Sequence, residues 1–479
     1  MSLTQILFFA GLGLAYQPLA RRRGREWLLL TASLLALYAL QPATVIRHLD
    51  FWLPTASLAL AVLTWCATRP PEERTLGEPA RTLGAAAALI LLLTLTRYLD
   101  PALRLTPTRP PGPAAVCAAL ALLAALAAFA LRLRSRRALV AGVALFLIAL
   151  FVILKSEPLA QGASAMLRSQ SGQQPHLASP LDLRWLGFSY IAFRLLHTLR
   201  DRLTGKLPTL TLREFLIYIL FFPALPAGPI DRAERFVGDL HAPSPALTEG
   251  GLRIAAGIFK KFVLADSLAI FTLGPETARQ ALAAASGGAA SNLWLWILLY
   301  AFAFRLYFDF SGYTDVAIGL GRLFGVRLPE NFIRPYLREN ITAFWNSWHM
   351  TLAGWFRSYF FNPLTRSLRS ARRPLPAGAI VFLGQLGTMV LIGLWHGITW
   401  NFALWGAWHG IGLFVHNRWT DLLRRRGSRS APTGARLRLA HLGGIAITFH
   451  FVPLGWAWFA LPSPGLSWCV LLGLFGMHP

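Results

Sequence analysis

Two histidines lie in an apolar stretch of the chain, and their side chains are suited to proton transfer. His396 and His409 occur in GLWHGITWNFALWGAWHG, and no Lys, Arg, Asp or Glu is found from Pro374 through Asn417. A neutral imidazole has one donor and one acceptor nitrogen, and burying either without a partner is costly. Histidine is a common general base because its unperturbed pKa of ~6.5 lies close to physiological pH. We therefore interpret His396 as a candidate base and His409 as a supporting, mainly structural residue.

A second segment, NITAFWNSWHMTLAGWFRSYFF, contains His349. Its apolar residues recur at intervals of 4, 3, 4, 3 and 4, which predicts one helical stripe: Ile341, Trp345, Trp348, Leu352, Trp355 and Tyr359. Asn346 and His349 lie on the flank of that stripe. Such a tryptophan-rich amphipathic helix is typical of an interfacial or re-entrant element. A lone histidine is more often structural, and the presence of a second histidine in an apolar run favours a catalytic role for His349.

Ionisable residues interrupt a third membrane-like segment, FRLYFDFSGYTDVAIGLGRLFG, at residues 304–325. Arg305 and Asp309 are four residues apart and could pair on one helix face. Ionisable groups at membrane depth usually face the protein interior or a wet path, although a purely structural ion pair explains them equally well. The three segments together supply the candidate substrate-binding residues: Trp345, Asn346, Trp395, Asn401, Asp309, Ser311, Tyr313 and Asp315.

The residue types exclude several other chemistries. Metal-dependent hydrolysis requires HExxH or clustered His and carboxylate ligands, and we expect no metal site. A serine hydrolase would carry GxSxG, which the chain lacks. The HxxxxD motif of glycerolipid acyltransferases is absent, since His197 and Asp201 are one residue too close. Three cysteines without CxxC spacing indicate no disulfide framework.

The elements that position these residues must lie in a membrane. The 479 residues are 55% hydrophobic and 14% charged, whereas a soluble chain has about 25% charged residues. The mean hydropathy is +0.49. Uncharged blocks recur along the chain, many of them near the roughly 17–25 residues that a helix needs to cross a bilayer. The composition predicts an all-α integral membrane protein with about eleven to thirteen spanning or re-entrant helices.

The net charge of +25 reflects mainly the basic loops between spans. Clusters of Lys and Arg mark cytoplasmic loops, so the basic stretches near residues 21–25, 69–81, 132–137 and 200–213 predict the cytoplasmic side. The same rule places the N-terminus and residues 156–180 outside. No separate basic domain exists, so nucleic acid is not an expected partner. Lys260 and Lys261 in GIFKKFVLADSLA are best explained as side chains that reach the membrane interface.

The chain divides functionally near residue 181. Residues 1–180 are rich in Ala and Leu and predict a scaffold of membrane helices. Residues 181–479 contain polar groups and breaks such as FFPALPAGPID. Broken helices at membrane depth are tolerated where protein or a wet cavity surrounds them. We therefore expect residues 181–479 to form the catalytic core, with re-entrant segments, within one continuous membrane domain.

Four motifs resemble the membrane-bound O-acyltransferase family, in its bacterial branch that modifies polysaccharides and cell-wall polymers. FDFSGYTDVAIGLGRLFGVRLPENF, GLWHGITWNFALWGAWHG and GIFKKFVLADSLA are similar to alginate O-acetyltransferases. FWNSWHMTLAGWFRSYFFNPL is similar to these and to the membrane protein of teichoic acid D-alanylation. The resemblance covers about residues 181–460.

This resemblance implies a helical fold in which peripheral spans surround a thinner centre crossed by a tunnel. The family's catalytic histidine corresponds to His396, and its second histidine to His349 with Asn346 beside it. The implied reaction transfers an acyl group, preferentially acetyl, from a cytoplasmic thioester such as acetyl-CoA or an acyl carrier protein. The acceptor is an extracytoplasmic polysaccharide or a partner transferase resembling an esterase. No permanently bound cofactor is implied, and the expected location is the bacterial inner membrane.

Three other functions remain open at this point. D-alanyl transfer from a carrier protein to a cell-wall polymer would use the same residues. A transporter would also have broken spans and intramembrane charges, but it predicts internally repeated halves, and we find no such repeat. A scaffold of a polysaccharide export complex would leave His349 and His396 without a purpose.

Overall fold

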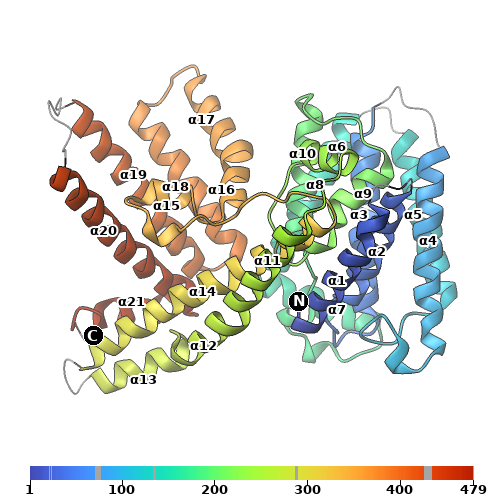
Figure 1. Cartoon of the computed structure of the whole chain (residues 1–479), viewed down its shortest axis with the longest axis horizontal. Coiled ribbons are helices and arrows are strands. Elements are labelled where there is room, and N and C mark those ends of the chain that lie inside the picture. The colour runs from blue at the N-terminus through green and yellow to red at the C-terminus, as the bar shows by residue number, and fades with distance from the viewer. Residues whose placement is uncertain are drawn as a thin grey trace. The chain divides into compact units, whose positions relative to one another are not determined.

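The computed structural model describes residues 1–20, 22, 24–70, 77–132, 136–285, 290–425 and 434–477 (Figure 1). Within these ranges the chain forms helices joined by short loops, and no strand occurs. Seven of the helices are long and apolar enough to cross a membrane. The predicted all-α integral membrane fold is therefore confirmed, whereas the tunnel implied by the resemblance stays a prediction.

The seven candidate spans share a length of at least nineteen residues. They are α3 (Leu49–Thr68), α4 (Gly77–Leu95), α5 (Pro113–Arg132), α6 (Arg136–Lys155), α14 (Ala290–Leu323), α18 (Ala377–His396) and α20 (Gly434–Ala460).

The remaining helices are shorter or more polar and do not qualify as full spans. The number of full spans in the described residues is therefore smaller than the eleven to thirteen spanning or re-entrant helices expected. The shorter or more polar helices are α1 (Leu3–Tyr16), α2 (Arg25–Ala39), α7 (Glu157–Gln170), α8 (Phe188–Leu203), α9 (Leu212–Leu220), α10 (Ala233–His241), α11 (Leu247–Ile258), α12 (Asp266–Leu268), α13 (Pro275–Ala285), α15 (Ile341–Trp345), α16 (Met350–Phe356), α17 (Asn362–Arg369), α19 (Trp400–Arg425) and α21 (Pro464–Gly473).

The chain forms two compact units. The first contains Met1–Ile254 and Val316–Pro329, and the second contains Ala255–Asp315 and Glu330–Pro479. All candidate site residues belong to the second unit. The boundary expected near residue 181 divides the chain by function and not by compactness, and it stays a prediction.

One side of the first unit gathers loops that lie far apart in the sequence. Gln41 donates to the carbonyl of Arg184 at 2.6 Å, and His48 Nδ1 lies 2.9 Å from the carbonyl oxygen of Arg109. The backbone N–H of Arg47 donates to Gln173 at 2.9 Å. These bonds place residues 41–48, the loop near 109 and the segment after α7 on the same side of the unit.

The opposite side of the first unit gathers arginine-containing segments. Arg213 pairs with Glu26 at 2.8 Å, and Arg25 donates to the carbonyl of Leu240 at 2.7 Å. Trp65 donates to the carbonyl of Leu210 at 2.9 Å. Helix α3 separates the two sides by about 30 Å, the length of twenty residues at 1.5 Å each. Segments predicted to be cytoplasmic therefore cluster away from residues 156–180, although Arg21, Arg23, Arg74 and Arg134 lie outside the described residues.

Helix α9 is too short to span a membrane, yet its apolar side chains are enclosed by the first unit. Leu212, Phe215 and the residues from Leu216 through Leu220 have at most 1% of their surface exposed. Thr211 and Glu214 cap its N-terminus reciprocally, and Glu78 accepts from the first backbone N–H groups at 3.3 and 3.2 Å. Side chains therefore bond the free backbone N–H groups at the start of α9, and α2, α3 and α4 pack along its length.

Helices α18 and α19 of the second unit pack with their backbones nearly in contact. A Cβ on Gly393 would lie 2.0 Å from the carbonyl oxygen of Phe402, and one on Gly406 would lie 2.4 Å from that of Met389. Neither distance is compatible with any side chain, so these glycines are required for the close approach. The connection at residues 397–399 joins the helices directly after His396.

The helix predicted across residues 341–359 is broken in the middle. Helix α15 ends at Trp345 and α16 begins at Met350. His349 lies between them with a φ of 42°, in the left-handed region, which costs a residue other than glycine roughly 1–3 kcal/mol. The 4-3-4-3-4 spacing therefore predicted the two helical pieces but not the break. The apolar stripe gave no indication of the pairing between residues 331–333 and 347–350 that supports it.

We expect Gln174 and Lys206 to lie on opposite sides of the membrane. In a cysteine-free background, Gln174→Cys should react with an impermeant maleimide on intact cells, and Lys206→Cys only after the membrane that holds the protein is opened. Both positions are exposed or half-exposed on the protein, so access depends on the bilayer. The reverse labelling pattern would show that the orientation is inverted, and equal labelling would show that the two sides are not separated.

Candidate functional site

His396 is the last residue of α18 and is half-buried among aromatic rings. Its ring centroid lies 4.4 Å from Trp395, 4.8 Å from Phe459 and 5.6 Å from Trp405. The C-terminal carbonyls of a helix carry partial negative charge, which stabilises positive charge on a nearby side chain. An imidazole at this helix end is therefore well placed to hold a proton that it takes from a substrate.

His349 is more deeply buried, with 3% of its surface exposed, and Asn331 contacts it directly. Asn331 Oδ1 lies 3.2 Å from His349 Nδ1 and also accepts from the backbone N–H of Thr351 at 3.1 Å. The Met350 N–H donates to the Asn331 carbonyl at 3.0 Å. Asn331 thus bonds the His349 ring and the backbone of the two residues that follow it. It is a site residue that sequence reasoning missed.

The hydrogen bonds of Asn331 assign the tautomer of His349. The backbone N–H of Thr351 can only donate, so the Asn331 atom it meets must be the oxygen, and His349 Nδ1 must carry a hydrogen to bond that oxygen. His349 Nε2 is then left with a free lone pair, and it is buried without a partner among the described residues. Burial lowers the pKa of His349 to about 3, so the ring is neutral at physiological pH.

Trp395 lies between the two histidines. Its ring centroid is 6.0 Å from that of His349 and 4.4 Å from that of His396. Phe310 covers His349 from another side at 4.7 Å. The structure therefore brings His349, Trp395 and His396 together on one aromatic wall, although they come from separate segments of the sequence.

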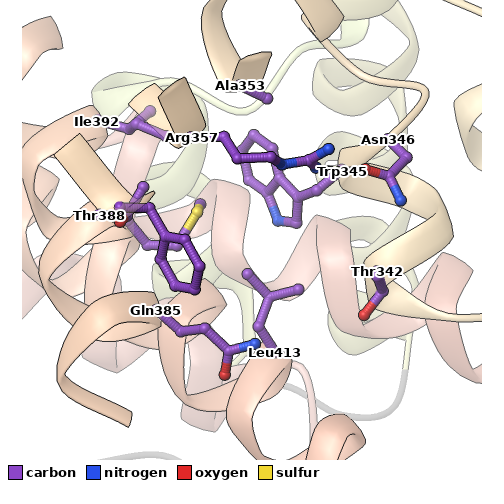
Figure 2. Close-up of a pocket in the computed structure, with 11 residues that line it drawn as sticks. Thr342, Trp345, Asn346, Ala353, Arg357, Gln385, Thr388, Ile392 and Leu413 are labelled. Atoms are coloured by element: carbon purple, nitrogen blue, oxygen red, sulfur yellow. Dashed lines mark hydrogen bonds between the residues drawn. The ribbon is translucent and has the colours of Figure 1, made fainter. Parts of the chain in front are cut away.

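A cavity of about 150 Å³ is lined by residues of the same segments, although His349, Trp395 and His396 are not among its lining residues (Figure 2). Its lining comes from α15 to α19 and is mostly apolar: Thr342, Trp345, Asn346, Ala353, Arg357, Phe361, Gln385, Thr388, Met389, Ile392 and Leu413.

One face of α18 leads along the cavity toward His396. Gln385, Thr388, Met389 and Ile392 line the cavity, and His396 follows Ile392 by one further turn of the same face. A ligand that extends along this face would therefore point toward the imidazole. The sequence reasoning missed Gln385 and Thr388, which could have been found as polar residues at helical spacing from His396.

Arg357 is the charged group of the cavity lining. It donates to Asn346 Oδ1 at 2.5 Å, and Figure 2 shows its side chain directed toward Asn346. The predicted binding residues Asn346 and Trp345 both line the same cavity. Arg357 was also missed, because in the sequence it is one of many arginines.

The acidic candidates are engaged in ion pairs with lysines. Asp315 pairs with Lys260 at 2.6 Å, and Asp309 pairs with Lys261 at 2.5 Å. Asp309 thus pairs with Lys261 where the sequence suggested Arg305. Both lysines have carboxylate partners, and their position at the membrane interface stays a prediction. The cause of the pairing is a close helix crossing, since a Cβ on Gly312 would lie 2.8 Å from the carbonyl oxygen of Gly257.

Three further candidates lie away from the cavity lining. Ser311 and Tyr313 are buried on α14, with 3% and 5% of their surface exposed. Asn401 donates to the carbonyl of Leu461 at 2.6 Å and to Ser467 at 3.1 Å, so its amide joins α19 to the α20–α21 turn. These bonds give Asn401 a structural role. Its predicted role in substrate binding stays a prediction.

His409 is completely buried, and among the described residues neither ring nitrogen has a hydrogen-bond partner. Its ring packs against Trp405 at 5.1 Å and Trp345 at 5.2 Å. His409 therefore packs against Trp345, which lines the cavity, and against Trp405, which packs against His396. It does not line the cavity itself.

The described residues contain no group of three or more His, Cys, Asp or Glu side chains that could hold a metal ion. What the site does offer is a histidine at a helix end, a second histidine with a free lone pair, and an apolar cavity with one cation. These features describe a helical membrane protein with two histidines on the segments that line an apolar cavity. The family model of the membrane-bound O-acyltransferases matches residues 132–450. The chain belongs to the membrane-bound O-acyltransferase family.

Curated relatives are 30–32% identical to this chain over the aligned regions. Identity to the teichoic acid D-alanyltransferase of Streptococcus thermophilus is 31% over 329 residues, covering 66% of this chain and 74% of the relative. Identity to a probable alginate O-acetylase of Azotobacter vinelandii is 32% over 300 residues, covering 60% and 53%. A peptidoglycan O-acetyltransferase of Helicobacter pylori is 30% identical over 331 residues, covering 63% and 58%.

The chain thus spans about half the length of its alginate O-acetylase relative. The predicted family and the predicted enzyme class, a membrane O-acyltransferase, are confirmed at the level of the family.

Replacing Asn331 by Ala should reduce acyl transfer by roughly ten-fold or more, because loss of its Oδ1 frees the His349 ring, and small misplacements can cost up to about 10²-fold. Thr351→Val is the matched control. It removes one hydroxyl donor to Asn331 (2.9 Å) and leaves the contact with His349 intact, so transfer should stay near normal. Rates are compared per amount of folded protein. Equal losses in both variants would show that Asn331 serves the local fold and not the orientation of His349.

Proposed function

We propose that this protein transfers an acyl group, preferentially acetyl, from a cytoplasmic thioester donor to a hydroxyl of an extracytoplasmic polysaccharide or to a partner transferase. The observation that carries this proposal is the placement of His396 and His349 on either side of Trp395, with His396 one helical turn beyond Ile392 of the apolar cavity. Family membership supports acyl transfer, and the relatives' names concern cell-wall polymers and alginate.

In the proposed reaction, His396 accepts the proton of the acceptor hydroxyl as its oxygen attacks the thioester carbonyl carbon. A new C–O bond forms, the C–S bond breaks, and the proton passes from His396 to the departing thiolate. The helix end beneath His396 stabilises the imidazolium during this exchange. The apolar walls keep out water, which would otherwise compete for the thioester.

His349 and Arg357 would have different tasks in this reaction. In its assigned tautomer His349 offers a lone pair at Nε2, so it can orient a hydroxyl by accepting its hydrogen bond. Stabilising the oxyanion requires donors, and Arg357 and the amide of Asn346 are two of the donors in the cavity lining. The structure therefore favours an orienting role for His349 and supports Asn346 as an oxyanion donor.

The course of α18 suggests how the two substrates approach. The helix begins shortly after Arg372 and Arg373 and ends at His396, a distance of about 30 Å. If basic segments lie inside, the thioester arm of acetyl-CoA or an acyl carrier protein enters from the arginine end, and the hydroxyl arrives from the other side. This arrangement fits a protein of the bacterial inner membrane.

D-alanyl transfer is a second candidate, favoured by the 74% coverage of the teichoic acid D-alanyltransferase. Both reactions use the same proton transfer and differ in the acyl group and its carrier. Purified protein supplied in parallel with acetyl-CoA, acetyl carrier protein and D-alanyl carrier protein distinguishes them. We expect the fastest acyl loss with an acetyl donor, and a clear preference for D-alanyl carrier protein would establish the second candidate.

Replacing His396 by Ala should lower acyl transfer by roughly 10²–10⁴-fold, the range for loss of a general base. His349→Ala should also reduce transfer strongly. His409→Ala should act mainly on expression and stability, because this ring fills the space between Trp345 and Trp405. His176→Ala, an exposed residue of the first unit, is the control. Near-normal transfer by a well-folded His396→Ala protein would refute the proposed base.

A transporter would behave differently in liposomes. We expect the purified protein to hydrolyse a short-chain acyl thioester slowly or to transfer its acyl group to an added acceptor, and this activity should vanish in His396→Ala. Solute flux should not exceed that of empty liposomes. Measurable flux combined with no reaction of any thioester donor would favour transport over acyl transfer.

A further inference from the structure

A large apolar groove lies between α19 and α20, apart from the candidate site. It has a volume of about 730 Å³, within the roughly 300–1,000 Å³ typical of small-molecule sites. From α19 it is lined by Trp408, Gly412, Val415, Trp419 and Leu423, which recur at helical spacing along one face. Neither the proposed reaction nor the sequence motifs give this groove a function.

The groove is closed at one end and open at the other. At the closed end Trp408 donates to the carbonyl of Phe451 at 3.0 Å and their rings stack at 4.9 Å. Beyond this contact the lining side chains are exposed, with 74% of Ile447, one turn from Phe451, and 57% of Trp419 accessible. From Trp408 to Leu423 the groove runs about 22 Å along α19, longer than the roughly 15 Å depth of one membrane leaflet.

Arginines gather at the open end. Arg424 and Arg425 follow Leu423 directly at the end of α19, and Arg436 and Arg438 lie in the first turns of α20. Figure 1 shows these two helix ends at the same edge of the second unit. All four side chains are exposed, and none forms an ion pair within the part of the chain that the structure describes. Helix α20 has no acidic residue.

Two carboxylates of the described chain lie near the groove, fewer than the four arginines at its open end. Asp421 pairs with Arg418 at 2.8 Å, and Glu339 accepts from the amide of Asn340 at 3.2 Å. The open end therefore carries an excess of positive charge next to a long apolar channel. This combination matches an amphiphile with a hydrocarbon chain and an anionic headgroup.

We propose that this groove binds an anionic phospholipid, with an acyl chain between α19 and α20 and the headgroup at Arg424, Arg425, Arg436 and Arg438. The groove shares a wall with the cavity of the candidate site. Thr342 lines the cavity, His416 lines the groove, and Thr342 Oγ1 lies 3.0 Å from His416 Nδ1. The bound lipid thus supports α15, the helix that carries Trp345.

The test compares phosphatidylglycerol with phosphatidylcholine of identical acyl chains, added to the delipidated full-length protein in detergent. Thermal unfolding and native mass spectrometry report stabilisation and retained lipid. Phosphatidylglycerol should bind the wild-type protein more tightly. Arg436→Gln/Arg438→Gln should weaken that binding by roughly ten-fold, since each arginine near an anionic headgroup contributes attraction. Arg372→Gln/Arg373→Gln, a pair elsewhere in the second unit, should leave it unchanged.

A second pair of variants tests the channel itself. Ile447→Trp should fill the groove and abolish retention of the lipid, whereas Leu442→Trp, an exposed residue of α20 outside the groove lining, should not. Equal binding of both lipids by the wild-type protein, or retained phosphatidylglycerol in Ile447→Trp, would overturn the proposal. A wild-type dimer that Ile447→Trp converts to a monomer would show that a second copy of the chain fills the groove, which would also overturn it.

Discussion

The close approach of α18 and α19 is the constraint on which the candidate site depends. Gly393 against Phe402 and Gly406 against Met389 leave no room for a side chain at either crossing. This contact fixes the end of α18 and therefore the position of Trp395 and His396. Met389 lies at this crossing and also lines the cavity, so the same contact fixes part of the cavity wall. Separating the two helices by even one methyl group would change all of these positions together.

The sequence allowed the membrane class, the family and the two principal histidines to be predicted, because each rests on a local signal. Uncharged runs predict spans, and His396 stands out in a stretch without charged residues. The break at His349 could not be predicted, since it depends on Asn331, eighteen positions earlier. Likewise Arg357 becomes distinctive only when folding brings it to Asn346. Lys261 competes successfully with Arg305 for Asp309 because Gly312 lets two helices meet.

The polar groups of the second unit are of two contrasting kinds. The paired charges Lys260–Asp315 and Lys261–Asp309 neutralise one another where helices cross. Around His349 and His409, in contrast, ring nitrogens are buried without partners in the described chain. Burying such groups is costly, so their surroundings must be held by other contacts, here aromatic packing and the bonds of Asn331. Within the described residues, an unsatisfied nitrogen is therefore found both at His349, a proposed site residue, and at His409, which is mainly structural.

The enclosed helix α9 has a consequence for how the protein reaches its membrane. With nine residues it is too short for the insertion machinery to recognise as a span, and its apolar side chains have no stable place until α2, α3 and α4 surround them. Those helices precede α9 in the chain and can already be inserted when α9 leaves the ribosome. Biogenesis must then proceed in order from the N-terminus, with the early helices acting as the receiving site for a segment that cannot enter the bilayer unaided.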